Sequence, residues 1–300
     1  MIKKIKRITK KIKPWGFQNL SIYDVAIFFW EGIHKGSIST RASSLAFNFF
    51  LAFFPAIIFL FTLIPYIPIS GFQDTLINIL GSILPPSTNE AAFNTIQDII
   101  NNPRGGLLSI GFLLALYFST NGANALIEAF NSSFHIQESR SLFYQRYMSL
   151  IITLILSAML ILTIVILIIG KAYIDRLLHM DIISISYLPL FGILKIILLS
   201  TMLYLGITLI FHLAPSKKLN AKILSPGTIF STIFIIFTSL IFSYYVNNFS
   251  QYNQVYGSIG TLMIILLWIY FNAIILLTGF ELNASIANAS INKEKSNLEL

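Results

Sequence analysis

The sequence contains no cysteine and few charged residues, and both shortages exclude classes of function. Without cysteine the chain has no disulfide, no thiolate nucleophile and no cysteine-ligated metal. Charged residues make up only 11% of the 300 residues, whereas soluble domains carry about 25%. Hydrophobic residues reach 56% and the mean hydropathy is +0.78, which is more apolar surface than a soluble domain of this length can bury. The composition therefore indicates an integral membrane protein.

The sequence also lacks the common catalytic motifs. The four histidines stand apart from one another, and none belongs to an HExxH frame: they are His34, His135, His179 and His212. No serine lies in a GxSxG segment, and no GxxxxGK[ST] segment could bind ATP. We therefore expect no enzyme, no metal and no cofactor, and any driving force must come from a gradient or a partner.

Six apolar stretches are long enough to span a membrane, because about 20 apolar residues cross a hydrocarbon core of about 30 Å. They lie near residues 42–64, 107–130, 147–170, 187–213, 223–246 and 258–287. In lipid every backbone N–H and C=O group needs a hydrogen-bond partner within the protein. A single segment can meet this need alone only as a helix, whereas strands must close into a barrel. The predicted fold is therefore all-α and polytopic, with six transmembrane helices in one domain from residue 37 to residue 289.

The basic residues predict an orientation, because lysine and arginine near the ends of spans stay on the cytoplasmic side. Of the 20 basic residues, sixteen fall on the side that holds both termini and three on the other side, while Lys195 lies inside the fourth span. The three are Arg104, Lys171 and Arg176. We expect six crossings with both termini in the cytoplasm, including a short tail from residue 290 to residue 300.

Residues 1–36 are predicted to form cytoplasmic basic and interfacial helices. Between Met1 and Lys13 the isoleucines fall near one helical face among lysines, which is typical of a basic helix that binds anionic headgroups. Nucleic acid is the alternative partner, but no aromatic stacking platform follows the basic run, so we expect lipid. A second amphipathic helix is predicted from Ser21 to Lys35, with Ser21 and Asp24 placed as in a capping box.

One connection is long, and it is predicted to lie on the outer side at residues 65–106. Two apolar stripes separated by Pro85 and Pro86 predict a helical hairpin. The hairpin is either packing material over the bundle or a lid or docking surface for a protein partner. The sequence contains no signal for the oligomeric state.

Polar residues inside the predicted spans are the candidate functional residues, because a membrane span retains few of them. Glu281 and Asn283 lie in the sixth span, where Glu281 needs either a partner, a wet cavity or a place at the interface. Asn121, Asn124 and Glu128 share one face of the second span, next to Gly122. This face either bonds helices together or lines a path for a solute or lipid headgroup.

The first span carries a polar seam and a helix breaker. Arg41 and Asn48 continue one face from the cytoplasmic end, although an arginine there usually extends to the headgroups. Pro55 is expected to kink or break the helix unless neighbours satisfy the freed carbonyl. Lys195 is the only basic residue within the bilayer that we expect could oppose Glu281 or Glu128, but it can also extend outward.

Several of these segments resemble the YihY/BrkB family of bacterial inner-membrane proteins, some of which carry an old ribonuclease BN label. The resembling segments are Arg41 to Phe47 with Phe54 and Pro55, Asn121 to Asn131, Pro226 and Gly227, Tyr256 to Gly260, Trp268 to Tyr270, and Gly279 to Ala284. Together these segments carry a resemblance that extends over nearly the whole chain from Arg41 to Ala289. Within them Tyr256 joins the path candidates, and Gly257, Gly260 and Gly279 are candidate packing positions.

The resemblance implies a six-helix membrane protein and a proposed role in transport or export of lipid-related molecules. Phe280 stands where such proteins often have a small residue, which would narrow the space beside Glu281. Three hypotheses follow. The first is a transporter whose polar residues line one cavity, the second is a non-catalytic scaffold, and the third, which the missing motifs disfavour, is a membrane-bound nuclease.

Overall fold

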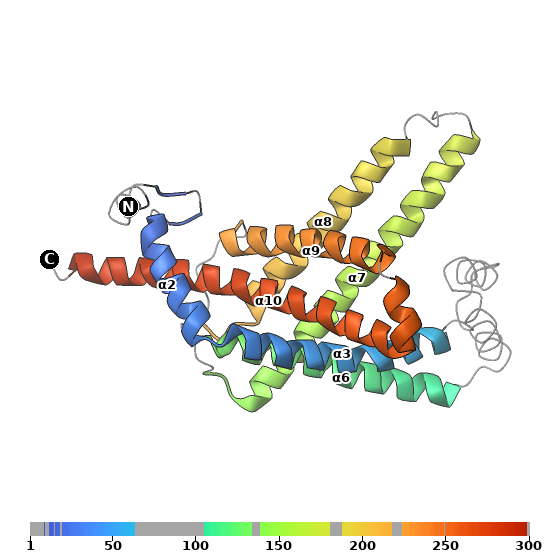
Figure 1. Ribbon diagram of the computed structural model, residues 1–300, viewed down its shortest axis with the longest axis horizontal. Coiled ribbons are helices and arrows are strands. Elements are labelled where there is room, and N and C mark those ends of the chain that lie inside the picture. The colour runs from blue at the N-terminus through green and yellow to red at the C-terminus, as the bar shows by residue number, and fades with distance from the viewer. Residues whose placement is uncertain are drawn as a thin grey trace. The chain divides into compact units, whose positions relative to one another are not determined.

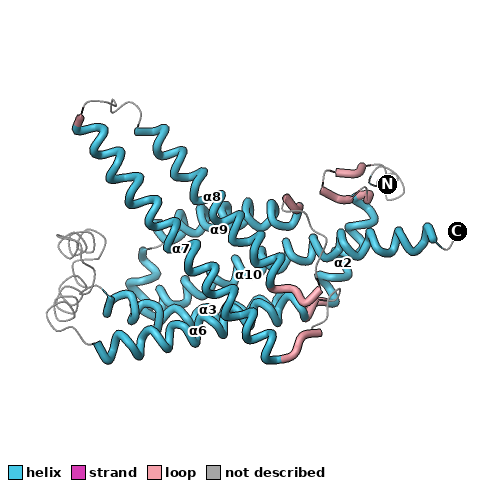
Figure 2. Tube along the Cα trace, turned by 180° about the vertical axis from the view of Figure 1, so that it is seen from behind, coloured by secondary structure: helices cyan, strands magenta, loops and turns pink. Residues whose placement is uncertain are grey.

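The computed structural model of the protein is built from helices, and no strand occurs among the residues that it describes (Figures 1 and 2). These residues are 9, 12–14, 16–18, 20–63, 105–133, 139–180, 188–217, 224–248 and 250–298. The helices are α2 (Ile22–Lys35), α3 (Ile38–Leu63), α6 (Gly105–Asn131), α7 (Leu142–His179), α8 (Leu188–Leu213), α9 (Pro226–Asn248) and α10 (Ser250–Leu298). The predicted all-α class is confirmed.

Each of the six predicted spans overlaps one of these helices, and five of the described helices are long and apolar enough to cross a membrane. The five candidate spans are Ser109–Asn131, Leu142–Leu178, Pro189–Leu213, Pro226–Tyr245 and Leu262–Asn292. Helix α3, which carries the first predicted span, is not among them. The protein is thus polytopic, while the sixth crossing stays a prediction.

The chain divides into two compact units. One unit consists of Met1–Ala46 with Ala123–Leu300, and the other consists of Phe47–Gly122. Helices α3 and α6 each contribute residues to both units. The predicted boundaries of the transmembrane domain at residues 37 and 289 remain a prediction.

In the first unit, α10 is the central element. It packs against α9 and α2, and α8 packs against α9 and α7 (Figure 1). Its contact with α9 depends on two glycines, since a Cβ on Gly279 would lie 2.6 Å from the carbonyl oxygen of Gly227. Small residues of this kind let helices in membranes approach closely. Gly279 therefore lies in the close contact between α9 and α10.

Helix α2 begins where the sequence predicts it and has the predicted cap. The hydroxyl of Ser21 accepts from the backbone N–H of Asp24 at 3.2 Å and donates to the Asp24 carboxylate at 2.6 Å. The helix buries Val25 in a small apolar cluster with Ile286 and Ala289 of α10. It is therefore attached to the last helix of the bundle through its apolar face, while Trp30 on another face is 65% exposed.

The apolar core of the first unit lies where α3, α6, α7, α8 and α10 contribute side chains. Leu45, Ile127, Phe130, Ile152 and Leu277 are almost completely buried there. By contrast, α7 and α8 expose many large aliphatic side chains, such as Leu160, Ile168 and Ile196. Exposed aliphatic side chains on helices this apolar are what a lipid-facing surface requires.

Two further predictions concern the outer hairpin and Pro55. Residues 64–104, which hold nearly all of the predicted outer hairpin, lie outside the described residues. Helix α3 runs through Pro55 to Leu63 without a break, so of the two predicted effects of this proline only a kink stays a prediction. Neighbouring helices and local adjustments commonly satisfy the carbonyl that proline frees in a membrane helix.

Candidate functional site

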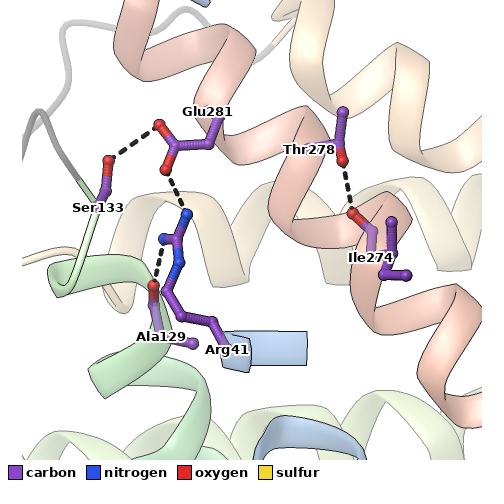
Figure 3. Close-up of polar contacts among 6 residues, drawn as sticks. All are labelled: Arg41, Ala129, Ser133, Ile274, Thr278 and Glu281. Carbon is purple, nitrogen blue, oxygen red and sulfur yellow. Dashed lines mark hydrogen bonds and ion pairs between the residues drawn. The ribbon is translucent and has the colours of Figure 1, made fainter. Parts of the chain in front are cut away.

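A buried ion pair joins Arg41 of α3 to Glu281 of α10 (Figure 3). The Nη2 of Arg41 lies 2.6 Å from Oε1 of Glu281, and the two side chains are 8% and 0% exposed. The residues are 240 positions apart in the sequence. The pair therefore ties the beginning of the described bundle to its last helix.

Helix α6 and the residues directly after it complete the cluster. The other terminal nitrogen of Arg41, Nη1, donates to the carbonyl oxygen of Ala129 at 2.7 Å. The hydroxyl of Ser133 donates to Oε2 of Glu281 at 2.9 Å, so each carboxylate oxygen receives a hydrogen bond (Figure 3). Charge-assisted hydrogen bonds of this kind are about twice as strong as neutral ones.

The cluster borders a block of aromatic rings. Phe280, adjacent to Glu281, stacks on Phe130 with ring centroids 4.1 Å apart, and Phe211 contacts both rings edge-on. Phe130 and Phe280 are fully buried. These rings belong to the buried apolar core that also contains Ala129, whose carbonyl oxygen binds Arg41.

A glycine makes room for the arginine. Gly36 ends α2, and a Cβ placed on it would lie 2.9 Å from Nη2 of Arg41 and 3.4 Å from Oε1 of Glu281. Any side chain at this position would push into the ion pair. The turn between α2 and α3 therefore forms part of the wall of the site.

Two sequence interpretations are corrected here. Arg41 does not extend to the headgroups, because its guanidinium turns inward onto Glu281. The expectation that Lys195 is the only basic residue able to oppose a glutamate is wrong for Glu281, whose partner is Arg41, and Lys195 itself is exposed on α8. The alternative in which Glu281 is buried with a partner is the one that the structure contains.

Glu128 lies apart from this cluster. Its Oε1 accepts from the side-chain amide of Asn124 at 2.6 Å, and its side chain is exposed. Asn124 in turn accepts from the hydroxyl of Ser149 on α7 at 3.2 Å. Here the polar face of α6 bonds to a neighbouring helix, which matches the structural alternative for this stripe.

Asn283 is placed at the beginning of α9. Its side-chain oxygen accepts from the backbone N–H of Gly227 at 2.8 Å, and its amide donates to the hydroxyl of Ser225 at 2.9 Å. The first backbone N–H groups of a helix have no partner within the helix, so a side chain from another helix can satisfy them. Asn283 therefore fixes how α9 starts against α10.

The other candidates are scattered. Asn48, Asn121 and Gly122 belong to the second unit, where Gly122 faces Phe49 at a distance that leaves ordinary van der Waals space for a Cβ. Gly260 is buried on α10. Tyr256 and Gly257 lie on the same helix, but the side chain of Tyr256 is outside what the structure describes.

Sequence reasoning missed three parts of the cluster. Ser133, the Ala129 carbonyl and Gly36 all contact the ion pair, yet a serine after a helix, a backbone oxygen and a glycine at a helix end are common in any sequence. Only Gly36 carried a signal, because glycine is typical of helix ends. No rule of spacing connects any of them to Glu281.

The helices and the buried polar cluster define an all-α integral membrane protein with several spans. The chain belongs to the BrkB family, since the family model described as "Virulence factor BrkB" matches residues 29–299. This family is the one that the sequence segments resemble, so the resemblance is confirmed. No solved structure matches the chain.

Curated relatives extend over most of the chain. The ribonuclease-like protein YfkH of Bacillus subtilis is 30% identical over 254 residues, covering 84% of this chain and 90% of the relative. A UPF0761 membrane protein of Aggregatibacter aphrophilus is 23% identical over 277 residues, covering 88% and 92%. Another, from Alteromonas mediterranea, is 24% identical and covers 97% and 95%. Two of these three names describe membrane proteins and one describes a likeness to ribonucleases.

Proposed function

We propose that this protein is a transporter or exporter that carries a small or lipid-like molecule along a polar path in the helix bundle. The observation that supports the proposal is the buried pair of Arg41 and Glu281. Ionisable groups inside membrane proteins are costly to bury, and they usually mark the paths of ions or substrates. In this proposal the pair closes the predicted cytoplasmic end of the path.

A scaffold would not need this pair. Replacing a buried ion pair by well-packed apolar residues often leaves stability unchanged or raises it, so stability alone is a weak reason to retain one. Packing of small residues already joins α9 to α10 at Gly227 and Gly279. The scaffold hypothesis therefore leaves Arg41 and Glu281 without a purpose, and transport provides one.

The proposal includes a location and an orientation. We place the protein in the inner, or plasma, membrane with six spans, both termini in the cytoplasm and the basic N-terminal segment on anionic lipid headgroups. The charge distribution along the sequence supports this orientation. We propose no enzymatic activity and no binding of nucleic acid, and we leave the oligomeric state open.

The test uses charge-neutral variants of the two glutamates. Glu281→Gln keeps the size of the side chain but removes its charge, and Glu128→Gln does the same at the exposed bond to Asn124. Asn288→Gln serves as the matched control, since Asn288 lies on α10 and bonds only its own helix at Ala284. Each variant is expressed in a strain that lacks the gene, and both growth complementation and the folded yield from size exclusion are measured.

We expect Glu281→Gln to be made in folded form, at a reduced yield because Arg41 loses its counter-charge, and to fail to complement, while Asn288→Gln complements fully. Full complementation by folded Glu281→Gln would overturn the transport proposal. If Glu281→Gln and Glu128→Gln both fail to give folded protein, the scaffold hypothesis is favoured. Metal-dependent cleavage of RNA by the purified protein, absent from Glu281→Gln, would favour a nuclease instead.

A further inference from the structure

The guanidinium of Arg41 has a donor that it does not use. Nη2 binds Glu281 and Nη1 binds Ala129, but Nε is buried and has no hydrogen-bond partner. A buried donor without a partner is unfavourable, because it has lost its hydrogen bonds to water and gained none. The side chain of Arg41 is only 8% exposed, so the unused donor is buried within the site.

The arrangement of the donors suggests which ligand would satisfy it. Nε and Nη2 form one edge of the planar guanidinium, and this edge matches two oxygens of a carboxylate or phosphate. Glu281 contacts this edge through Oε1 alone, while its Oε2 accepts from Ser133. Glu281 is therefore a one-oxygen occupant of a two-oxygen site.

A second unused group lies one helical turn from Glu281. Ser285 is fully buried, and its hydroxyl has no hydrogen-bond partner. Because residues four positions apart share a face of a helix, Ser285 lies on the face of α10 that carries Glu281. Two of the three buried side-chain atoms without a partner in the described chain thus belong to Arg41 and to this face.

We propose that Arg41 binds a phosphate-type oxyanion and that Glu281 occupies its place as an internal competitor in the state seen here. The proposal rests on the proposed transport function and names the class of its substrate. The edge of Arg41 and the hydroxyls of Ser133 and Ser285 are four donors, which matches the four oxygens of a tetrahedral phosphate. The phosphate belongs either to a lipid headgroup or to a free ion.

The test measures equilibrium binding to the purified full-length protein in a neutral detergent by isothermal titration calorimetry. Inorganic phosphate and dioctanoyl phosphatidylglycerol are the two probes, and dioctanoylglycerol is the lipid without phosphate. The variants are Glu281→Gln, Arg41→Gln and the double variant Arg41→Lys with Glu281→Gln. Arg146→Gln is the matched control, since Arg146 is an exposed arginine on α7.

We expect Glu281→Gln to bind at least one phosphate probe about tenfold more tightly than the wild type, because the competing charge is gone. Arg41→Gln and the double variant should lose this binding, since lysine lacks the two-donor edge. Arg146→Gln should bind as the wild type does. If Arg41→Gln does not fold, the double variant compared with Glu281→Gln gives the same answer.

The probes separate the two sources of phosphate. Binding of phosphatidylglycerol but not of inorganic phosphate supports a lipid headgroup, and the reverse supports a free ion. Binding of neither probe to Glu281→Gln, or equal binding of dioctanoylglycerol, would overturn the proposal. Because binding is measured without transport, a protein that binds the probe while Glu281→Gln still complements would overturn only the transport proposal.

Discussion

Arg41 and Glu281 are each expensive to bury alone and tolerable only together. Moving one charge out of water costs several kcal/mol even after the surroundings relax, and the partner offsets much of this cost. The hydrogen bonds from Arg41 to Ala129 and from Ser133 to Glu281 offset more of it. Removing either residue should therefore be worse than removing both.

We predict that Arg41→Ala lowers the free energy of unfolding by about 3–5 kcal/mol, because it leaves Glu281 buried without a counter-charge. The double variant Arg41→Met with Glu281→Met should recover most of this loss, since the site then holds only apolar side chains. Unfolding in a denaturing detergent, followed by circular dichroism, measures both. A double variant as unstable as the single one would show that the two residues contribute independently.

At this scale the sequence identified the residues but not their pairing. Arg41 and Glu281 stood out because charges are rare in the spans, yet nothing in the sequence says that residues 240 positions apart meet. Glu128 stood out equally and lies instead on an exposed bond to Asn124. The sequence shows which charged residues are costly to bury, whereas only the fold determines which of them pair with each other.

Among the described elements, α9 and α10 make a close contact that two glycines allow. A Cβ at Gly279 would meet the backbone of Gly227 and the hydroxyl of Ser231, and a Cβ at Gly227 would lie 2.6 Å from Oδ1 of Asn283. Backbone cannot move aside as the end of a side chain can. This contact also sets the place where Asn283 meets the beginning of α9.

We predict that Gly279→Ala destabilises the protein by about 1–3 kcal/mol, because the helices must move apart to admit the methyl group. Gly206→Ala on α8 is the matched control, since the nearest neighbour of its Cβ would be a Leu156 methyl group at 3.9 Å. The melting temperature in detergent, measured from the fraction that stays monodisperse after heating, compares the two. Equal melting temperatures would contradict the close contact.

The sequence predicts membrane spans, and the helices that carry them are longer. The predicted span at residues 147–170 lies within α7, which runs from Leu142 to His179, and the span at residues 258–287 lies within α10, which runs from Ser250 to Leu298. Hydropathy measures how much of a helix is apolar, not how far its backbone hydrogen bonds continue. At about 1.5 Å per residue, the 38 residues of α7 are longer than the apolar core of a bilayer.

At the scale of the whole molecule, the prediction to be tested is that α3 crosses the membrane. Five described helices are long and apolar enough to do so, and the sixth crossing is a prediction from the sequence. If α3 crosses, the exposed residue Lys13 lies on the same side as the exposed residue Lys217. If it does not, the two residues lie on opposite sides.

Because the chain has no cysteine, single cysteines can decide this without further changes. We predict that Lys171→Cys reacts with a membrane-impermeant maleimide from outside the cell, whereas Lys13→Cys and Lys217→Cys react only after the membrane is opened. Labelling is read as a mass shift on a gel. Reaction of Lys13→Cys from outside, with Lys217→Cys still protected, would reduce the count to five.

The position of the ion pair also has a consequence for biosynthesis. Ribosomes make the chain from its N-terminus, so Arg41, which is 240 positions before Glu281, leaves the exit tunnel long before it. Until the final helix is inserted, the guanidinium has no counter-charge in the bundle and is best accommodated in water at the membrane surface. The ion pair can therefore form only after α10 has been inserted.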